Sequence, residues 1–151
     1  MQGALNQAKY LAWTPRSTKN VFLITDAPGH GRDICDWGDD YPDGSPDGFK
    51  LEDQMKEFAA QAITFTMVKV NERCNAMIDV MKKGYAAQGE QLVISDLAEA
   101  CKSDSKEQVT AKFVKNASFI LSASLGGPGK ARPSGTVLWD TSKFELNQWF
   151  S

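Results

Sequence analysis

Residues 21–31 read Val-Phe-Leu-Ile-Thr-Asp-Ala-Pro-Gly-His-Gly, and their pattern indicates the fold class. Its first five residues form a nearly uninterrupted apolar run of strand formers, and the turn-forming residues from Asp26 onward end that run. Such a run is typical of a strand that is buried within a parallel sheet. We therefore expect a buried parallel strand over residues 21–25, with Asp26 directly beyond its carboxyl end.

Downstream of this stretch, helical and strand patterns alternate along the chain. Residues 50–61 and 71–85 carry apolar residues at helical spacing, whereas residues 63–70 and 92–94 are rich in strand formers. The apolar faces of the two predicted helices consist of Leu51, Met55, Phe58, Ala59, Met77, Ile78, Met81 and Tyr85. Alternation with short connections predicts right-handed crossovers, and hence an α/β fold with a parallel sheet and flanking helices.

The two ends of the chain carry further patterns. Residues 3–13 predict a short helix that cannot continue through Pro15, and its apolar face consists of Leu5, Ala8, Leu11 and Ala12. Residues 105–122 predict another helix, with an apolar face formed by Val109, Phe113, Ala117, Ile120 and Leu121. The Gly- and Pro-rich residues 125–133 predict a linker, and residues 136–139 predict a final short strand.

Charge and apolar content disfavour two classes of protein. Seventeen basic and 19 acidic residues give a net charge of −2 without a basic stripe, so we expect no nucleic-acid binding. The apolar runs are far shorter than the roughly 18 residues of a membrane helix, and no signal peptide is evident. The three cysteines, at 35, 74 and 101, are widely spaced and odd in number, which favours reduced thiols in the cytoplasm.

Asp26 is the first candidate functional residue. Ligands of open parallel sheets gather beyond the carboxyl ends of the strands, where a carboxylate can bind a hard cation. The alternative is that Asp26 caps a turn through its own backbone, as Asp before a Pro-Gly turn often does. The pattern alone leaves both interpretations open.

Residues 26–49 predict a long loop crowded with Gly, Pro and Asp. Residues 43–48 match part of a calcium-binding EF-hand loop, but Gln54 stands where that loop needs a bidentate carboxylate. We therefore favour a solvated acidic loop over a calcium site. The acidic residues concerned are Asp33, Asp36, Asp39, Asp40, Asp43 and Asp47.

His30 is the only histidine, so a His-based triad or a multi-histidine zinc site has little to draw on. Its flanking glycines favour a tight backbone bend in which the imidazole forms a hydrogen bond across the loop. The competing hypothesis is a metal-assisted hydrolase that uses Asp26 and His30 together with Asp36 or Asp40.

Three longer strings carry a family resemblance. Besides residues 21–31, these are Gly-Asp-Asp-Tyr-Pro-Asp-Gly-Ser-Pro-Asp-Gly at 38–48 and Leu-Glu-Asp-x-Met-Lys-x-Phe at 51–58. Together with the helix pattern at 3–13 and the Asn-x-Met-Ile stretch at 75–78, they resemble the von Willebrand factor A-like domain found with alpha-type protein kinases. The resemblance covers residues 3–85.

The resemblance implies a doubly wound fold with a metal-ion-dependent adhesion site at the carboxyl edge of the sheet. Of the three segments that normally supply ligands, only the Asp after this strand has a counterpart here, Asp26. Mg²⁺ or Mn²⁺ is the implied cation, and one carboxylate plus waters would hold it only weakly. The implied rim of the site consists of Thr25, His30, Asp39, Asp40, Tyr41, Asp43 and Asp47.

The resemblance also sets the expected organisation and function. Residues 1–85 correspond to the C-terminal half of such a domain, in a partial doubly wound sheet, and residues 86–151 form a continuation or extension. Because no nucleotide-binding loop, strand lysine or zinc-ligand set of a kinase is visible in residues 86–151, we expect no catalysis by this chain alone. The implied function is a protein-binding accessory module, able to pair with a missing N-terminal half-domain. The alternative is a fragment of a larger serine/threonine kinase.

Overall fold

The computed structural model describes residues 1–35 and 38–124. The predicted linker at 125–133 and the predicted strand at 136–139 lie outside the described residues. Among the described residues, no helix has both the length and the apolar character that crossing a bilayer requires. The elements in chain order are α1 (Gln2–Lys9), β1 (Lys19–Thr25), α2 (Leu51–Ala60), β2 (Ile63–Lys69), the 3-10 helix η1 (Glu72–Cys74), α3 (Asn75–Ala86), β3 (Val93–Asp96), α4 (Ala98–Ser103) and α5 (Lys106–Ser124).

The three strands form one parallel sheet in the order β1-β2-β3. Thr25, the last residue of β1, is aligned with Lys69 of β2, which is in turn aligned with Asp96 of β3. The carboxyl ends of all three strands therefore meet at one edge of the sheet, with α-helices between consecutive strands. This arrangement confirms the predicted parallel α/β fold.

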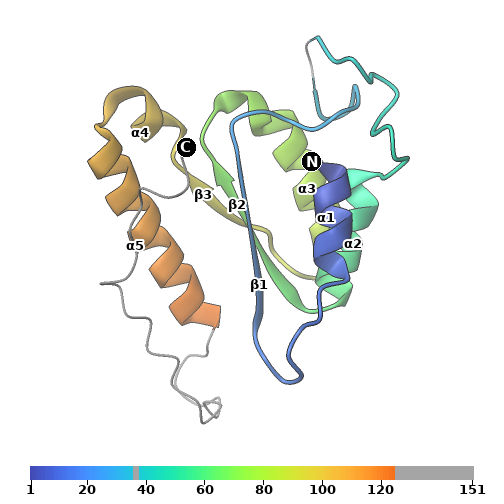
Figure 1. Cartoon of the computed structure of the whole chain (residues 1–151), viewed down its shortest axis with the longest axis horizontal. Coiled ribbons are helices and arrows are strands. Elements are labelled where there is room, and N and C mark those ends of the chain that lie inside the picture. Colours follow the sequence, from blue (N-terminus) through green and yellow to red (C-terminus); the bar gives the residue numbers. More distant parts are fainter. Residues whose placement is uncertain (36–37, 125–151) are drawn as a thin grey trace.

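Helices α1, α2 and α3 cover one face of the sheet (Figure 1). Alternate residues of β2, such as Phe65 and Met67, are fully buried against this layer. The rings of Phe58 in α2 and Phe65 in β2 lie 5.0 Å apart. All eight residues of the two predicted helical faces are buried, which confirms the predicted core: Leu51, Met55, Phe58, Ala59, Met77, Ile78, Met81 and Tyr85.

Helix α5 lies on the opposite face (Figure 1). Ser95 of β3 is aligned with Val68, so its side chain points away from the face that Met67 occupies. The amide of Asn116 in α5 donates a hydrogen bond of 2.9 Å to the Ser95 hydroxyl, which places α5 on this second face. Helices on both faces of a parallel sheet correspond to the expected partial doubly wound arrangement.

Two predictions at the start of the chain were wrong in part. The first helix ends at Lys9, and the predicted apolar residue Leu11 is 57% exposed. The strand at 21–25 was expected to be buried, but it lies at the end of the strand order and is mostly half-buried. Ile24 is 55% exposed because, within the described residues, no helix covers that part of the second face.

Differences at the other end of the fold are smaller. The third strand runs from Val93 to Asp96 rather than over 92–94, and helix α4, at Ala98–Ser103, was not predicted. Six residues are too few to show a helical period in the sequence. The predicted apolar face of α5 is half-buried rather than buried, and Leu121 on that face is 39% exposed.

Candidate functional site

Asp26 lies at the carboxyl edge of the sheet, directly after β1. Its side chain is exposed, and no hydrogen bond or ion pair links its carboxylate to another residue in the described ranges. The turn after β1 is instead held by Thr25, whose hydroxyl accepts a hydrogen bond from the backbone N–H of Ala27 and donates one to its carbonyl oxygen. The interpretation of Asp26 as the turn cap is therefore wrong.

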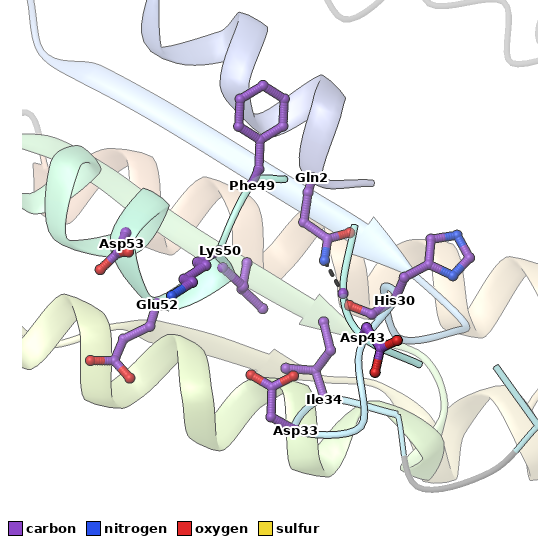
Figure 2. A pocket seen from close by; sticks show the side chains of 11 residues that line it. Gln2, His30, Asp33, Ile34, Asp43, Phe49, Lys50, Glu52 and Asp53 are labelled. Atoms are coloured by element: carbon purple, nitrogen blue, oxygen red, sulfur yellow. Dashed lines mark hydrogen bonds between the residues drawn. The ribbon is translucent and has the colours of Figure 1, made fainter. Parts of the chain in front are cut away.

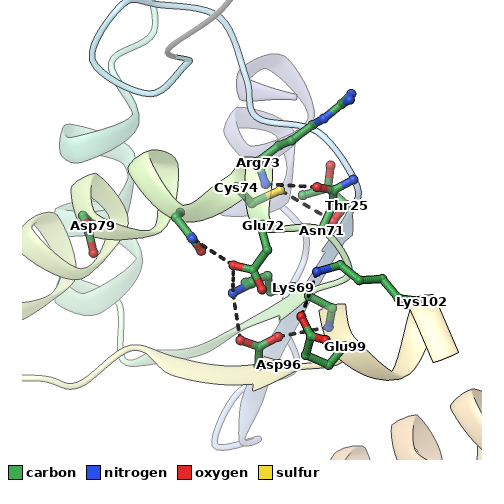
Figure 3. A network of polar contacts seen from close by, with 12 residues as sticks. Thr25, Lys69, Asn71, Glu72, Arg73, Cys74, Asp79, Asp96, Glu99 and Lys102 are labelled. Carbon is green, nitrogen blue, oxygen red and sulfur yellow. Dashed lines mark hydrogen bonds and ion pairs between the residues drawn. The ribbon is translucent and has the colours of Figure 1, made fainter. Parts of the chain in front are cut away.

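A lysine organises the same edge next to Asp26 (Figure 3). The ammonium of Lys69, at the end of β2, lies 2.8 Å from a carboxylate oxygen of Glu72 and 2.8 Å from one of Asp96. The Lys69 side chain is only 8% exposed. Asn75 donates a further hydrogen bond to Glu72, and the backbone N–H of Ala98 donates one to Asp96. The ends of β2 and β3 and the starts of α3 and α4 are thereby held together.

The charges in this network stabilise one another. Burial alone would lower the pKa of Lys69, but hydrogen bonds to Asp96 and Glu72 outweigh that effect and raise it. The hydrogen bond from Lys69 lowers the pKa of Glu72, and it lowers the pKa of Asp96 against the opposing effect of burial. All three groups therefore remain charged near neutral pH, with two carboxylates on one ammonium.

Cys74 links the network to β1. Its thiol is fully buried and lies 3.8 Å from the backbone carbonyl oxygen of Thr25. Burial raises the pKa of Cys74, and the nearby negative charge of Asp26 raises it further. The thiol therefore stays protonated and acts as a small packing group rather than a nucleophile. Cys35, Cys74 and Cys101 form no disulfide with one another.

The loop between β1 and α2 is organised around Asp39. One Asp39 carboxylate oxygen lies 2.7 Å from Nδ1 of His30 and accepts a hydrogen bond of 3.0 Å from the backbone N–H of Tyr41. The other accepts a hydrogen bond of 2.6 Å from the backbone N–H of Gly31. The His30 ring also meets the Tyr41 ring edge-on at 4.9 Å. The predicted structural role of His30 across the loop is thus confirmed.

Acid should release this part of the loop. The N–H of Gly31, the imidazole of His30 and the N–H of Tyr41 lower the pKa of Asp39 from 3.8 to about 2. Because the folded-state pKa is the lower one, the stabilisation is complete above pH 3.8 and is lost as the pH falls toward 2. We expect the amide resonances of Gly31 and Tyr41 to titrate together with a midpoint near 2.

Asp39→Asn is the matched variant for this titration, because it keeps the size of the side chain and removes the charge. It should abolish the acid transition of both amides and make the loop more accessible to proteases at neutral pH. An unchanged titration in Asp39→Asn would show that Asp39 does not hold the loop.

The remaining predicted rim residues are not brought into one cluster. Asp40, Asp43 and Asp47 are exposed, and Asp43 faces Arg32 at 3.7 Å in a solvent-exposed pair. No group of three or more histidine, cysteine or carboxylate side chains suited to a metal ion occurs within residues 1–35 and 38–124. Asp36, a candidate in the hydrolase hypothesis, is outside these ranges.

A cavity of about 480 Å³ lies beside the loop, between the starts of α1 and α2 (Figure 2). The side-chain amide of Gln2 donates a hydrogen bond of 2.9 Å to the His30 carbonyl oxygen at its wall. Hydrogen bonds from Lys56 and then Lys83 lower the pKa of Glu52, which also lines the cavity, to about 2. This carboxylate is already paired with two lysines, so it is poorly suited to acid–base chemistry near neutral pH.

Sequence reasoning did not identify Lys69, Glu72 and Asp96 as partners. Each is unremarkable alone, and only the parallel register brings residues 69 and 96 together. The one available signal was a charged residue at the end of each apolar strand, namely Lys69 after Met67-Val68 and Asp96 after Ile94-Ser95.

Comparison with known proteins gives one partial relationship. No protein-family model and no solved structure gives a significant match. Alpha-protein kinase vwkA of Dictyostelium discoideum is 34% identical over 82 residues, which are 54% of this chain and 13% of that protein. The chain is therefore similar to a small part of an alpha-protein kinase, about one eighth of its length.

Proposed function

We propose that this chain is a protein-binding accessory module that resembles the von Willebrand factor A-like domain associated with alpha-type protein kinases. The parallel α/β sheet and the partial similarity to an alpha-protein kinase support this proposal. So do the Asp-Ala-Pro-Gly-His-Gly string at 26–31 and the acidic turn string at 38–48. The partner is a protein that docks at the carboxyl edge of the sheet.

The observation that carries the proposal is the state of Asp26. Its carboxylate is exposed and has no partner among the described residues, although it follows the strand at the edge where ligands of parallel sheets bind. The ion pairs of Lys69 with Glu72 and Asp96 hold the ends of β2 and β3 together at this edge, and hydrogen bonds to Asp39 order the neighbouring loop. An unpaired carboxylate on an ordered surface is available for a partner.

The described residues do not supply a complete cation site. Mg²⁺ requires near-octahedral oxygen coordination. Asp26 supplies one carboxylate, and no group of three or more metal-ligating side chains occurs within residues 1–35 and 38–124. Any Mg²⁺ or Mn²⁺ at Asp26 therefore needs ligands from the partner or from another segment, such as the half-domain expected to pair with β1. Because the three cysteines are odd in number and widely spaced, which favours a reducing compartment, we propose that the module acts in the cytoplasm.

A photo-reactive amino acid at Ala27 tests the proposal in the cells that produce the protein. Ala27 is exposed next to Asp26, and only its backbone groups take part in the turn. Ala60 is the matched control position, because it is also exposed but lies at the end of α2, near the amino ends of the strands. Irradiation joins the docked protein to the chain, and mass spectrometry identifies it. The yield of the cross-linked product is then measured for Asp26→Asn and in the presence of a chelator. The first shows whether docking needs the Asp26 charge, and the second whether it needs a divalent cation.

The second candidate is a fragment of a larger kinase, and the coverage of only 13% of the matching kinase favours it. A native polypeptide much larger than 16.6 kDa on a blot would support this alternative. The hydrolase hypothesis has no comparable support, since the His30 imidazole is paired with Asp39 rather than with Asp26.

A further inference from the structure

The outer edge of β3 borders an open groove, on the opposite side of the sheet from β1. β3 is the last strand in the order β1-β2-β3, and its outer side carries no strand within residues 1–35 and 38–124. A hollow of about 250 Å³ runs along it, lined by all four residues of β3 and by Asn116, Phe119 and Ile120 of α5. Because its lining includes no residue of β2, the hollow lies at the edge of the sheet rather than above its centre.

The backbone of β3 presents hydrogen-bonding groups to this groove. Leu97, directly after β3, donates its backbone N–H to the carbonyl oxygen of Lys69 in β2, at 2.8 Å. The backbone groups of successive residues in a strand alternate in direction, so Ser95 also faces β2, whereas the N–H and C=O groups of Ile94 face outward. β3 contains neither proline nor lysine, two residues that often block an edge strand. This edge can therefore accept an added strand.

Helix α5 forms the other wall of the groove. The hydrogen bond from Asn116 to Ser95 holds the helix beside the strand. Phe119, about one turn further along α5, lines the groove and is 75% exposed. A segment that enters between β3 and α5 would cover this ring, which gives it an apolar contact in addition to the backbone hydrogen bonds.

The end of the groove near α4 offers an unpaired positive charge. A second hollow, of about 450 Å³, continues the first, since Asp96 and Asn116 line both of them. The two carboxylates in its lining are already paired with lysines, and Lys112 is paired with an aspartate. The ammonium of Lys115 forms no ion pair with any residue of the ranges 1–35 and 38–124. A carboxylate of an incoming segment would complement it.

The spacing of Lys115 and Phe119 matches the repeat of an extended chain. Helix α5 runs antiparallel to the strands (Figure 1). The four residues from Lys115 to Phe119 advance about 6 Å along a helix. Two residues of a strand advance about 7 Å, and their side chains lie on the same face. A segment paired with β3 can therefore place one side chain at Lys115 and the next side chain of that face at Phe119.

We propose that the groove between β3 and α5 binds an extended segment of a partner protein, which adds to the sheet as a strand beside β3. The segment carries an acidic and an apolar residue two positions apart. The acidic side chain pairs with Lys115, the apolar one packs on Phe119, and hydrogen bonds to the backbone of Ile94 supply affinity that does not depend on sequence. This surface is separate from Asp26 and from the outer edge of β1, so it goes beyond the docking proposed above.

Amide hydrogen exchange in the isotope-labelled full chain tests whether this edge is open. The outward-facing N–H of Ile94 should exchange fast in the free protein, because it has no strand partner. Slow exchange that depends on protein concentration would assign the edge to a second copy of the chain. Slow exchange at every concentration would assign it to another segment of this chain. Either result would overturn the proposal.

Selection of a displayed library of short random peptides on the full chain supplies the probe. We expect enrichment of peptides with Asp or Glu two positions from an aliphatic or aromatic residue. An enriched peptide, made synthetically, should slow exchange of the Ile94 amide roughly tenfold or more at saturation. Failure to enrich this pattern, or binding that leaves Ile94 exchange unchanged, would contradict strand addition at β3.

Two substitutions separate the side-chain contacts, with the affinity measured by fluorescence anisotropy of the labelled peptide. Phe119→Ala should weaken binding roughly tenfold, as for other exposed aromatic anchors that become covered on binding. Val114→Ala is the matched control, since Val114 is 54% exposed on α5 but does not line the groove. Lys115→Gln should weaken binding of the acidic peptide but not of the same peptide with Gln at the acidic position. Equal effects of Phe119→Ala and Val114→Ala would place the peptide elsewhere.

Methylation of the peptide backbone tests the pairing without any change to the protein. An N-methyl group on the peptide nitrogen that faces β3 removes a ladder donor and should abolish binding. The same group on the next nitrogen, which faces away from β3, should leave binding unchanged. Equal tolerance of both methyl groups would show that the peptide does not pair with the strand.

Discussion

Phe58→Ala is expected to lower the free energy of unfolding by about 3–5 kcal/mol, the usual cost of truncating a buried Phe. Phe58 is fully buried, and its ring packs on Phe65 between α2 and the central strand. Domains of this size have total stabilities of about 5–15 kcal/mol, so the variant should be close to unfolding at ambient temperature. Denaturant titration followed by circular dichroism measures the change.

Phe119→Ala is the matched control, because Phe119 is 75% exposed on α5. The same truncation there should change stability by no more than about 0.5 kcal/mol. Equal losses in the two variants would contradict a core centred between α2, α3 and β2.

Gly84→Ala should destabilise the fold although alanine favours helices. A Cβ at Gly84 would lie 2.9 Å from the Cβ of Met55 and would collide with the backbone carbonyl oxygen of Glu52. Overpacking costs about 1–3 kcal/mol, here toward the upper end because backbone cannot give way, while alanine returns about 1 kcal/mol of helix propensity. We expect a net loss of about 2 kcal/mol.

Lys82→Ala on the exposed side of the same helix is the control for Gly84→Ala, with an expected change within about 0.5 kcal/mol. Helix propensity alone would make Gly84→Ala more stable than the parent protein. A gain in stability would therefore show that α2 and α3 do not approach closely at Gly84.

Local periodicity was enough to predict the layer that packs on the first face. Met55 and Phe58 in one helix, and Met77 and Met81 in the next, are one turn apart and all lie in the core. The apolar face of a helix is recognised from residues three or four positions apart in the sequence. Its prediction therefore does not depend on how the rest of the chain folds. The alternation of strands and helices then left the parallel sheet as the arrangement with short connections.

Burial of β1 could not be predicted in the same way. An apolar run is common to central and edge strands, and only the strand order shows that β1 has one neighbour among the described residues. Ile24 is exposed because its side chain points to the second face of the sheet, which no described helix covers at β1, whereas Leu23 points to the face that packs on the core.

The residues of the polar site differ in the same way in how far the sequence could predict them. The position of Asp26 at the carboxyl edge followed from the strand that precedes it. The role of Asp39 could not be predicted, because nothing in the sequence distinguishes it from the other five carboxylates of the loop. Only the folded loop brings Asp39 to His30 and Gly31. The Lys69 network was equally hidden, since its partners come from two different strand ends.

Photo-cross-linking from position 27 tests the central claim most directly. The account predicts that a defined protein is joined at position 27 and not at position 60, and that Asp26→Asn strongly lowers the yield. Loss of the product in the presence of a chelator would add that a divalent cation bridges Asp26 and the partner. Equal products at positions 27 and 60, or a product at position 27 that is indifferent to Asp26→Asn, would contradict docking at the carboxyl edge of the sheet.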